Sequence, residues 1–273
     1  MPPANKERVR RWLVVFAVAA LAYLVVAYGL LPLLWRHYEH QQGLASKPMI
    51  TETAEGIPGD PLNVGLVGDE AEVHRIMLAA GWHPADAITL RSSIAIAGSV
   101  VLDRPYEAAP VSTLFYEGRS QDFAFEKIIG GSADRRHHVR LWLVLAKGDE
   151  GRSVWLGAAT RDLGVGLSDY TGQITHHIAA DIDAERDALV ADLTASRMVT
   201  ALYKVSGVGP TLFGRNGEGD NYFTDGELRF AVISPGGTPV SANPVELEGP
   251  ALSELKDNLW SATRGLGPAG EPY

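Results

Sequence analysis

The sequence predicts an α+β protein in which one N-terminal transmembrane helix precedes a soluble domain with a mostly antiparallel or mixed sheet. Residues 12–35 are almost wholly apolar and carry no charge. Short segments with strand-like alternation then recur between residues 62 and 233, whereas helical spacing of apolar residues appears in only a few places. We therefore expect two or three helices to pack against the sheet.

Length and composition limit the classes of protein to consider. The chain has 273 residues, which suits one or two domains, and a net charge of -9, which argues against a nucleic-acid partner. It contains no cysteine, so disulfides, thiol catalysis and cysteine-based zinc sites are excluded. A divalent metal, if one is bound, must take its ligands from His, Asp, Glu or main-chain oxygens.

The apolar segment 12–35 is long enough to cross a lipid bilayer, because about 20 apolar residues span its hydrocarbon core. It is longer than the apolar part of a cleavable signal peptide, so we expect an uncleaved signal anchor. Four basic residues precede it (Lys6, Arg8, Arg10 and Arg11). This excess of positive charge predicts that residues 1–11 are cytoplasmic. The residues after 35 should then lie on the outer side of the inner membrane.

The remainder divides into a linker, a domain and a tail. Residues 36–58 have no hydrophobic period and contain several Gly, Pro and Gln residues, so we expect a stalk. The extracytoplasmic domain is predicted at 59–245. A C-terminal helix and tail are predicted at 246–273, with an amphipathic helix at 248–262 and a loose end from residue 265.

The domain begins with a predicted strand at 62–67, followed by a helix with Asp69 as N-cap and Glu72 as its capping-box partner. A second helix is favoured at 86–102. A later helix ends near Arg197 and is expected to have Asp183 as N-cap. Further strands are predicted at 110–116, 122–127, 135–145, 154–162, 198–205 and 227–233.

The strand at 135–145 contains the densest group of functional side chains. Because alternate residues of a strand point to opposite faces, Val139, Leu141, Leu143 and Leu145 should share one face, with His137 at its edge. The other face should carry Arg136, His138, Arg140 and Trp142. Cationic side chains are costly to bury without partners, so this second face indicates a site.

The next strand, 154–162, should form an antiparallel hairpin with this one. If Leu145 pairs with Ser153, His138 faces Thr160 and Arg136 faces Asp162 on one surface. The pairing is conditional, because a slip of one residue would exchange the two faces.

Three hypotheses account for these residues and for the second histidine pair. A metal site would use His138, His176, His177 and Asp181 or Asp183 as ligands. An anion site would use Arg119, Arg136 and Arg140, with His138 as proton donor and Thr160 and Asp162 beside it. A structural role would pair the histidines with carboxylates and the arginines with Asp122 or Asp162.

Known catalytic motifs do not assign a reaction. The nucleophile elbow, the P-loop and the dinucleotide fingerprint are missing, so a serine-triad hydrolase is not expected and no catalytic residues are assigned. The Asn- and Asp-rich stretch 214–226 lacks the EF-hand spacing, and polar turns explain its composition.

Several blocks of the sequence together resemble one family. They are Pro61–Gly68, Ala80–Trp82, Arg119–Lys127, Arg136–Trp142, Trp155–Asp162 and Thr175–Asp187. In this order they resemble the LssY C-terminal domain family, over about residues 59 to 230. The resemblance implies a bacterial family whose domain is often joined to membrane segments that resemble acid phosphatases of the PAP2 type. This chain departs from that arrangement with its single anchor, so the resemblance implies an envelope role and little chemistry.

Three functions follow as expectations. The first is an accessory domain that binds an anionic envelope ligand, such as a phospholipid or a phosphate-bearing glycan. The second is a metal-dependent phosphoesterase, which requires the two histidine pairs to meet in space. The third is a scaffold that contacts membrane protein partners.

Overall fold

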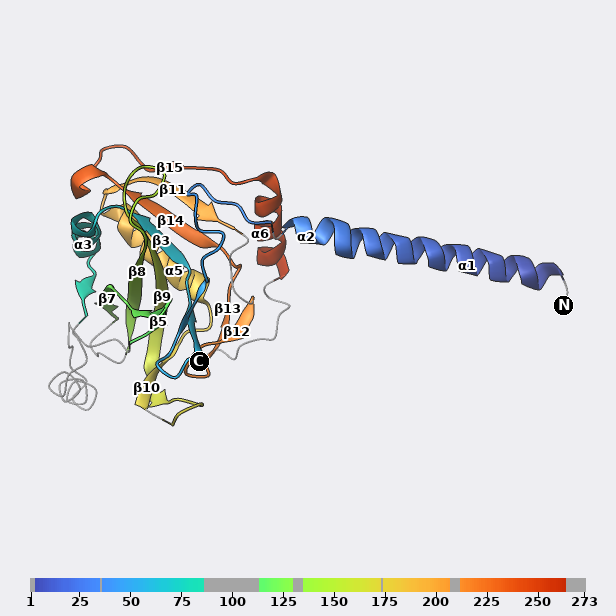
Figure 1. The fold of residues 1–273 in the computed structure, drawn as a ribbon, viewed down its shortest axis with the longest axis horizontal. Helices are drawn as coiled ribbons and strands as arrows, with labels where there is room; N and C mark the ends of the chain where they lie inside the picture. The colour runs from blue at the N-terminus through green and yellow to red at the C-terminus, as the bar shows by residue number, and fades with distance from the viewer. Residues whose placement is uncertain are drawn as a thin grey trace. The chain divides into compact units, whose positions relative to one another are not determined.

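The structure is a computed structural model that describes residues 3–34, 36–85, 113–129, 135–172, 174–206 and 212–263. The chain divides into two compact units, Met1–Arg36 with Pro250–Gly265 and His37–Gly249 with Leu266–Tyr273 (Figure 1). The helix predicted at 86–102 and the tail predicted from residue 265 lie outside the described residues.

The first unit is built on one long apolar helix. It consists of α1 (Pro3–Leu24), a π-helical turn η1 (Val25–Leu30) and α2 (Leu31–Leu34). Among the described residues it is the one helix long and apolar enough to span a membrane, with 29 residues from Lys6 to Leu34 and a mean hydropathy of 2.5. None of this segment is buried, which distinguishes it from the core helix of a soluble protein. Helix α6 (Ala251–Thr263) contacts α2 and confirms the predicted C-terminal helix.

The second unit is organised by a mixed sheet with the strand order β15-β11-β14-β3-β9-β8-β7-β4, and β10 pairs with β9 beside this path. Its strands are β3 (Val64–Val67), β4 (His83–Pro84), β7 (Phe123–Ile128), β8 (Arg136–Leu145), β9 (Val154–Leu167), β10 (Ile174–Ile178), β11 (Val199–Val205), β14 (Leu228–Ile233) and β15 (Val245–Glu246). The pairs β14–β3 and β11–β15 are parallel and the others antiparallel. The predicted α+β class with a mixed sheet is confirmed.

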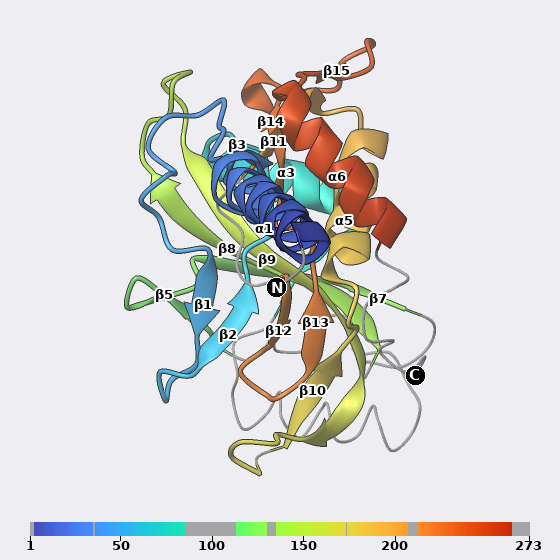
Figure 2. The same cartoon turned by 90° about the vertical axis from the view of Figure 1, so that its right-hand side faces the viewer.

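Two smaller sheets complete the unit. One has the order β2-β1-β5-β6 and contains β1 (Ile50–Glu52), β2 (Pro58–Pro61), β5 (Phe115–Tyr116) and β6 (Arg119–Ser120). The other is the hairpin of β12 (Phe213–Arg215) and β13 (Asn221–Phe223). Figure 2 shows both beside the lower half of the main sheet. They cover the part of β8 and β9 that carries the polar side chains.

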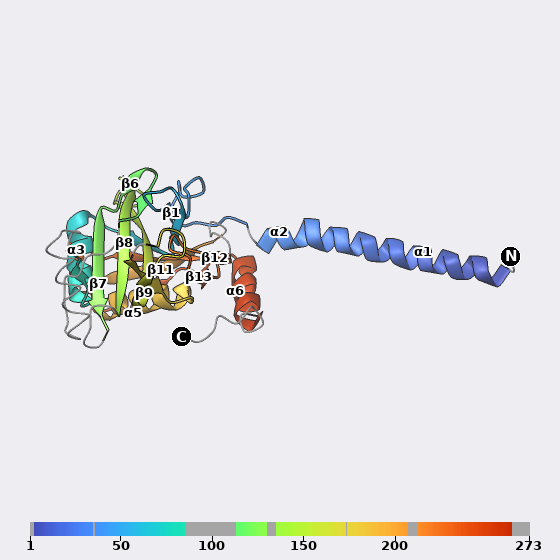
Figure 3. The same cartoon turned by 90° about the horizontal axis from the view of Figure 1, so that it is seen from below.

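The main sheet separates two hydrophobic cores. Val139 and Leu141 of β8 belong to a core shared with α3 (Glu70–Ala79) and α5 (Ile182–Ala195). Trp142 belongs to the core on the other face, where Leu44, Met49 and Tyr116 pack. Figure 3 shows α5 on one side of the sheet and β1 and β6 on the other. The predicted division of β8 into two faces is confirmed as far as Leu143, because alternation along the strand sends successive residues to different cores. Leu145 was predicted on the Val139 face but packs against the Trp142 core, because the register shifts between Leu143 and Leu145.

The pairing of β8 with β9 is also as predicted at the polar end. His138 lies opposite Thr160, and a register shift between Leu143 and Leu145 pairs Leu145 with Val154 in place of Ser153. Strand β9 is longer than expected and continues to Leu167, where it pairs with β10. This extension brings the second histidine pair next to the first hairpin.

Helix caps confirm one prediction and correct another. Asp69 accepts a hydrogen bond from the backbone of Glu72, and the Glu72 side chain accepts one from the backbone of Asp69, so the capping box is complete. The N-cap of α5 is Asp181 and not Asp183, because the Asp181 carboxylate accepts from the Ala184 backbone N–H. The Asp183 side chain is buried and bonds to other groups.

Part of the segment predicted as a stalk packs onto the domain. Leu44 and Thr51 are fully buried, and Met49 is nearly so. Residues 50–52 form β1, which pairs with β2 and β5. The apolar residues in this stretch are too few to show a period, yet Leu44 and Met49 pack into the core on the Trp142 face of the sheet.

Candidate functional site

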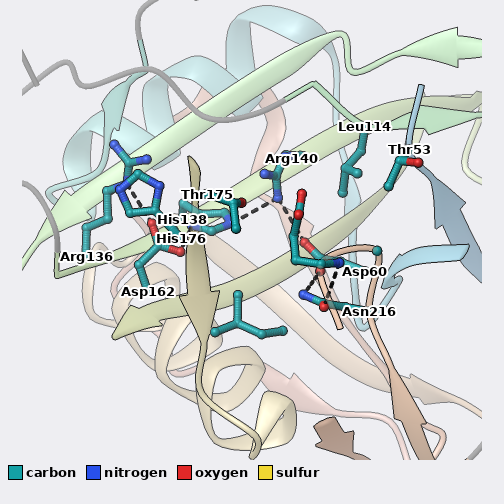
Figure 4. Close-up of a pocket in the computed structure, with 13 residues that line it drawn as sticks. Thr53, Asp60, Leu114, Arg136, His138, Arg140, Asp162, Thr175, His176 and Asn216 are labelled. Atoms are coloured by element: carbon teal, nitrogen blue, oxygen red, sulfur yellow. Dashed lines mark hydrogen bonds and ion pairs between the residues drawn. The ribbon is translucent and has the colours of Figure 1, made fainter. Parts of the chain in front are cut away.

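A small cavity lies where β8, β9 and β10 meet the smaller sheets. Its free volume for groups the size of a water molecule is about 30 Å³. The lining residues are Thr53, Asp60, Leu114, Arg136, His138, Arg140, Asp162, Thr175, His176, Ile178, Asn216, Gly217 and Glu218. Figure 4 shows Arg136, His138, His176 and Asp162 at one end and Arg140, Asp60 and Asn216 at the other. The structure therefore brings together four of the six residues predicted for an anion site.

Arg136 is held by two buried carboxylates. Its Nη1 atom donates to Glu126 Oε2 at 2.8 Å, and its Nε atom donates to Asp162 Oδ2 at 2.9 Å. All three side chains are at most 1 % exposed. Removing these charged groups from water is costly, and the ion pairs offset that cost only when their geometry is good. The pair with Arg136 therefore holds the Asp162 carboxylate in a fixed position beside the cavity.

His138 is oriented from both sides of its ring. Nδ1 lies 3.0 Å from Asp162 Oδ1, and Nε2 lies 2.6 Å from Thr160 Oγ1 and 2.9 Å from Arg140 Nη1. A guanidinium can only donate, so Nε2 must accept and its lone pair is occupied. The geometry assigns the ring proton to Nδ1, where it faces the Asp162 carboxylate.

Asp162 itself is stabilised as a carboxylate. Burial alone would raise its pKa, but the adjacent His138 and His176 rings and the Arg136 guanidinium hold that pKa well below its usual value. The charged form of Asp162 is therefore the form that orients His138 at neutral pH.

Arg140 connects the central strand to two distant segments. Its Nη1 atom donates to Asp60 Oδ2 at 3.0 Å, and Asn216 donates from Nδ2 to Asp60 Oδ1 at 3.2 Å. Asn216 also accepts from the backbone N–H groups of Glu218 and Asp220, which shapes the β12–β13 turn. Burial lowers the pKa of Arg140 even though Asp60 and Asp162 act to raise it.

The Nε2 atom of His176 is buried and has no hydrogen-bond partner among the described residues. His37 and His138 also have such ring nitrogens, but each of these rings lies 3.2 or 3.0 Å from a carboxylate oxygen. Burial lowers the pKa of His176 to about 4, with Asp162 opposing the shift and Arg136 and Arg140 adding to it. At neutral pH the cavity therefore presents an uncharged imidazole whose Nε2 atom has no partner in the part of the chain that the structure describes.

The other candidate residues lie outside the cavity lining. His177 Nδ1 bonds to Asp220 at 2.6 Å, and Asp181 caps α5. Arg119 bonds to Asp122 and to the Leu143 carbonyl near the surface. Thr160 is buried behind His138 and contacts it through Oγ1.

The contacts expected for a structural role are present for three histidines. His137 bonds to Glu185, His138 faces Asp162 and His177 bonds to Asp220. The two pairs do meet in space, because His138 and His176 line the same cavity. Within the part of the chain that the structure describes, however, no group of three or more His, Asp or Glu side chains is arranged to hold a metal ion.

Negative charges outnumber positive ones around the cavity. Arg136 and Arg140 contribute two positive charges, whereas their partners Glu126, Asp162 and Asp60 and the lining residue Glu218 contribute four negative ones. The cationic face predicted for β8 is therefore neutralised by carboxylates from β7, β9 and β2. An anionic ligand must therefore be held by directed hydrogen bonds, because this set of residues supplies no net positive field.

Sequence reasoning missed Asp60, Asn216 and Thr175 as lining residues. Asp60 and Asn216 lie 156 residues apart in the chain, so no local spacing connects them. The Asn- and Asp-rich composition of 214–226 could have indicated a polar site. That composition was explained by polar turns alone.

A comparison with protein families gives one match at this point. The family model described as LssY C-terminus matches residues 43–228, which include every residue that lines the cavity. Comparisons with curated proteins and with solved structures give no significant match.

Proposed function

The chain belongs to the LssY C-terminus family, and we propose that it is a membrane-anchored protein whose family domain binds a small anionic group in the cavity. The anchor is the helix from Lys6 to Leu34. The ligand site is the space bounded by Arg136, His138, Arg140 and His176. Binding, rather than turnover, is the function that these contacts favour.

The anchor and its orientation are supported by length and charge. A helix of 29 residues rises about 43 Å, which matches a bilayer with its headgroups. Lys6, Arg8, Arg10 and Arg11 lie before the apolar part, which favours a cytoplasmic N-terminus in the bacterial inner membrane. The domain is then extracytoplasmic.

This orientation is testable because the natural chain has no cysteine. A Glu55→Cys variant places a thiol on an exposed site of the domain. We expect a membrane-impermeant maleimide to label it in cells whose outer membrane is permeabilised but whose inner membrane is intact. Labelling only after the inner membrane is lysed would reverse the orientation.

The size and charge of the cavity limit the ligand class. A free volume of about 30 Å³ accommodates two or three water-sized groups. Two oxygens of a phosphodiester or of a carboxylate fit this volume, whereas an extended glycan does not. The excess of negative charge in the lining also favours a monoanion over a dianion, because every further negative charge on the ligand meets Asp60, Asp162 and Glu218.

The observation that carries the proposal is the buried, unpartnered nitrogen of His176. Buried polar atoms are almost always hydrogen-bonded, and leaving one unpaired costs about 1–3 kcal/mol. A ligand oxygen in the cavity would supply the missing partner by accepting a hydrogen bond from Nε2. The neighbouring Arg136 and Arg140 guanidinium groups stabilise negative charge at that position.

The test compares binding by the full chain in a nonionic detergent. The probes are glycerophosphoglycerol as a phosphodiester, inorganic phosphate and acetate, measured by titration calorimetry. We expect saturable binding of the phosphodiester or of acetate, weakened about tenfold or more in His176→Gln because one charge-assisted hydrogen bond is lost. The control is His83→Gln, an exposed histidine on β4 outside the cavity lining.

The same measurement separates a free ion from a lipid headgroup. Inorganic phosphate binding as tightly as the phosphodiester would indicate a free anion as ligand. Binding of vesicles that contain phosphatidylglycerol, reduced by His176→Gln, would indicate a lipid. Absence of saturable binding for every probe, or equal binding by both variants, would contradict the proposal.

A further inference from the structure

Helix α6 turns its apolar residues outward. Leu252, Leu255 and Leu259 are 44, 47 and 50 % exposed. With about 100° of rotation per residue, they share one face of the helix with Ala251 and Ala262, which are also exposed. A contiguous leucine stripe of this kind is unusual on a surface in contact with water, because apolar side chains gain free energy when they leave water.

The buried side of α6 is mainly polar, although half-buried Trp260 belongs to it. Ser253 and Lys256 are 6 and 4 % exposed, and Lys256 forms an ion pair with Asp257 at 3.3 Å. An ordinary surface helix does the reverse and buries its leucines. The inversion indicates that the leucine stripe faces an apolar medium and not water.

The position of α6 identifies that medium. α6 contacts α2, the final turn of the long apolar helix, within the same compact unit. Because that helix rises about 43 Å and a bilayer with headgroups is about 40–45 Å thick, α2 reaches the headgroup region. Figures 1 and 3 show α6 running across the direction of α1, so it lies along the plane of a membrane that α1 crosses.

We propose that α6 lies in the headgroup region of the bilayer that α1 crosses and inserts Leu252, Leu255 and Leu259 among the acyl chains. The inference rests on the anchor proposed above, and it is independent of the ligand cavity. Continuity with the membrane-spanning helix favours lipid over a second protein, because the stripe is already held at the lipid boundary by α2.

The charges of α6 predict how the contact is made. The helix contains Glu254, Lys256 and Asp257, so it has more acidic than basic residues. Interfacial helices that depend on anionic lipids are rich in Lys and Arg. The contact of α6 with the membrane should therefore be made by its apolar side chains. Its strength should be equal in phosphatidylcholine and phosphatidylglycerol bilayers and should not depend on salt concentration.

The experiment uses single cysteines in the full chain, reconstituted in phosphatidylcholine nanodiscs and labelled with bimane. Leu255→Cys and Leu259→Cys report on the stripe, Glu254→Cys is an exposed control on the same helix, and Leu21→Cys reports on the anchor. The readout is quenching by lipids that carry a nitroxide on the acyl chain. We expect quenching at residues 255 and 259 to exceed that at 254 at least threefold.

The possible results distinguish the proposed position of α6 from the proposed membrane-spanning helix. Strong quenching at residue 21 with equal, weak quenching at 254, 255 and 259 would overturn the placement of α6 and leave the anchor intact. Weak quenching at residue 21 would overturn both. Probes at 255 and 259 that are shielded from lipid nitroxides and from aqueous iodide would show that protein covers the stripe, which also overturns the inference.

Discussion

Arg140 on β8 and Asp60 on β2 are 80 residues apart in the chain, and Nη1 of Arg140 lies 3.0 Å from Oδ2 of Asp60. Both residues are almost fully buried, at 3 and 5 % exposure. Asn216 donates to the other Asp60 oxygen, so this carboxylate joins β8, β2 and the β12–β13 turn. One wall of the cavity therefore depends on a single buried acid.

Asp60→Asn should destabilise the domain strongly. The change keeps the shape of the side chain but removes the negative charge beside the buried Arg140, and breaking a buried pair in this way costs about 3–5 kcal/mol. Urea unfolding of the full chain in detergent, followed by tryptophan fluorescence, measures the loss. In the exposed pair of Arg229 with Glu246, Glu246→Gln should cost less than about 1 kcal/mol. Similar losses for the two variants would refute the special role of Asp60.

The proton of His138 should be found on Nδ1. Nε2 accepts from Arg140 and lies against the Thr160 hydroxyl, so only Nδ1 is left to donate, toward Asp162. Long-range nitrogen–proton NMR of the ¹⁵N-histidine-labelled chain at pH 7 distinguishes the two tautomers. Asp162→Asn should shift the His138 signals most among the eight histidines. A proton on Nε2 in the natural chain would mean that Arg140 does not donate to this ring.

Two aspartates at the start of α5 should differ in their effects on stability. Asp183 accepts from Arg186, from the Thr224 hydroxyl at 2.8 Å and from the Asp225 backbone at 2.7 Å. Its removal in Asp183→Ala leaves buried donors unpaired and should cost about 3 kcal/mol. Asp181→Ala removes one cap bond to Ala184 and should cost about 1 kcal/mol. Unfolding midpoints measured side by side test the order, and a larger effect at Asp181 would reverse it.

The features predicted correctly are those that depend on local patterns. The capping box at Asp69 and Glu72 needs a spacing of only three residues. The two faces of β8 follow from alternation as far as Leu143. The register of His138 with Thr160 was predicted from a Leu145–Ser153 pair, and the structure reaches the same register through a Leu145–Val154 pair and a register shift. Asp183 was mistaken for the cap because both aspartates precede the same apolar stripe, and sequence spacing does not decide which backbone N–H each carboxylate reaches.

The parts of the cavity that escaped prediction depend on contacts between distant segments. Asp60 neutralises Arg140 across 80 residues, and Glu126 comes from a neighbouring strand to neutralise Arg136. The sequence indicates a cationic face, whereas folding supplies carboxylates that outnumber its positive charges. The pairing of β10 with the extension of β9 was equally nonlocal, and it places His176 in the cavity.

The pH dependence of stability should contain a contribution from His176. Its pKa is about 4 in the folded chain, below the ordinary value of 6.5, because burial disfavours the imidazolium. Between pH 6.5 and 4 the unfolded chain binds this proton and the folded chain does not. The free energy of unfolding should therefore fall as the pH falls through this window, by roughly 2–3 kcal/mol from this group.

His176→Gln should remove that contribution, because glutamine does not titrate. Urea unfolding of the natural chain and of His176→Gln at pH 7, 5.5 and 4.5 gives the free energy of unfolding of each. Because only the natural chain loses stability through this histidine, its free energy of unfolding should fall relative to that of the variant as the pH falls. A bound monoanion near the ring should raise the pKa of His176, so glycerophosphoglycerol should stabilise the natural chain more at pH 5 than at pH 7. Equal stabilisation at the two pH values would show that the anion does not lie against His176, whatever its affinity.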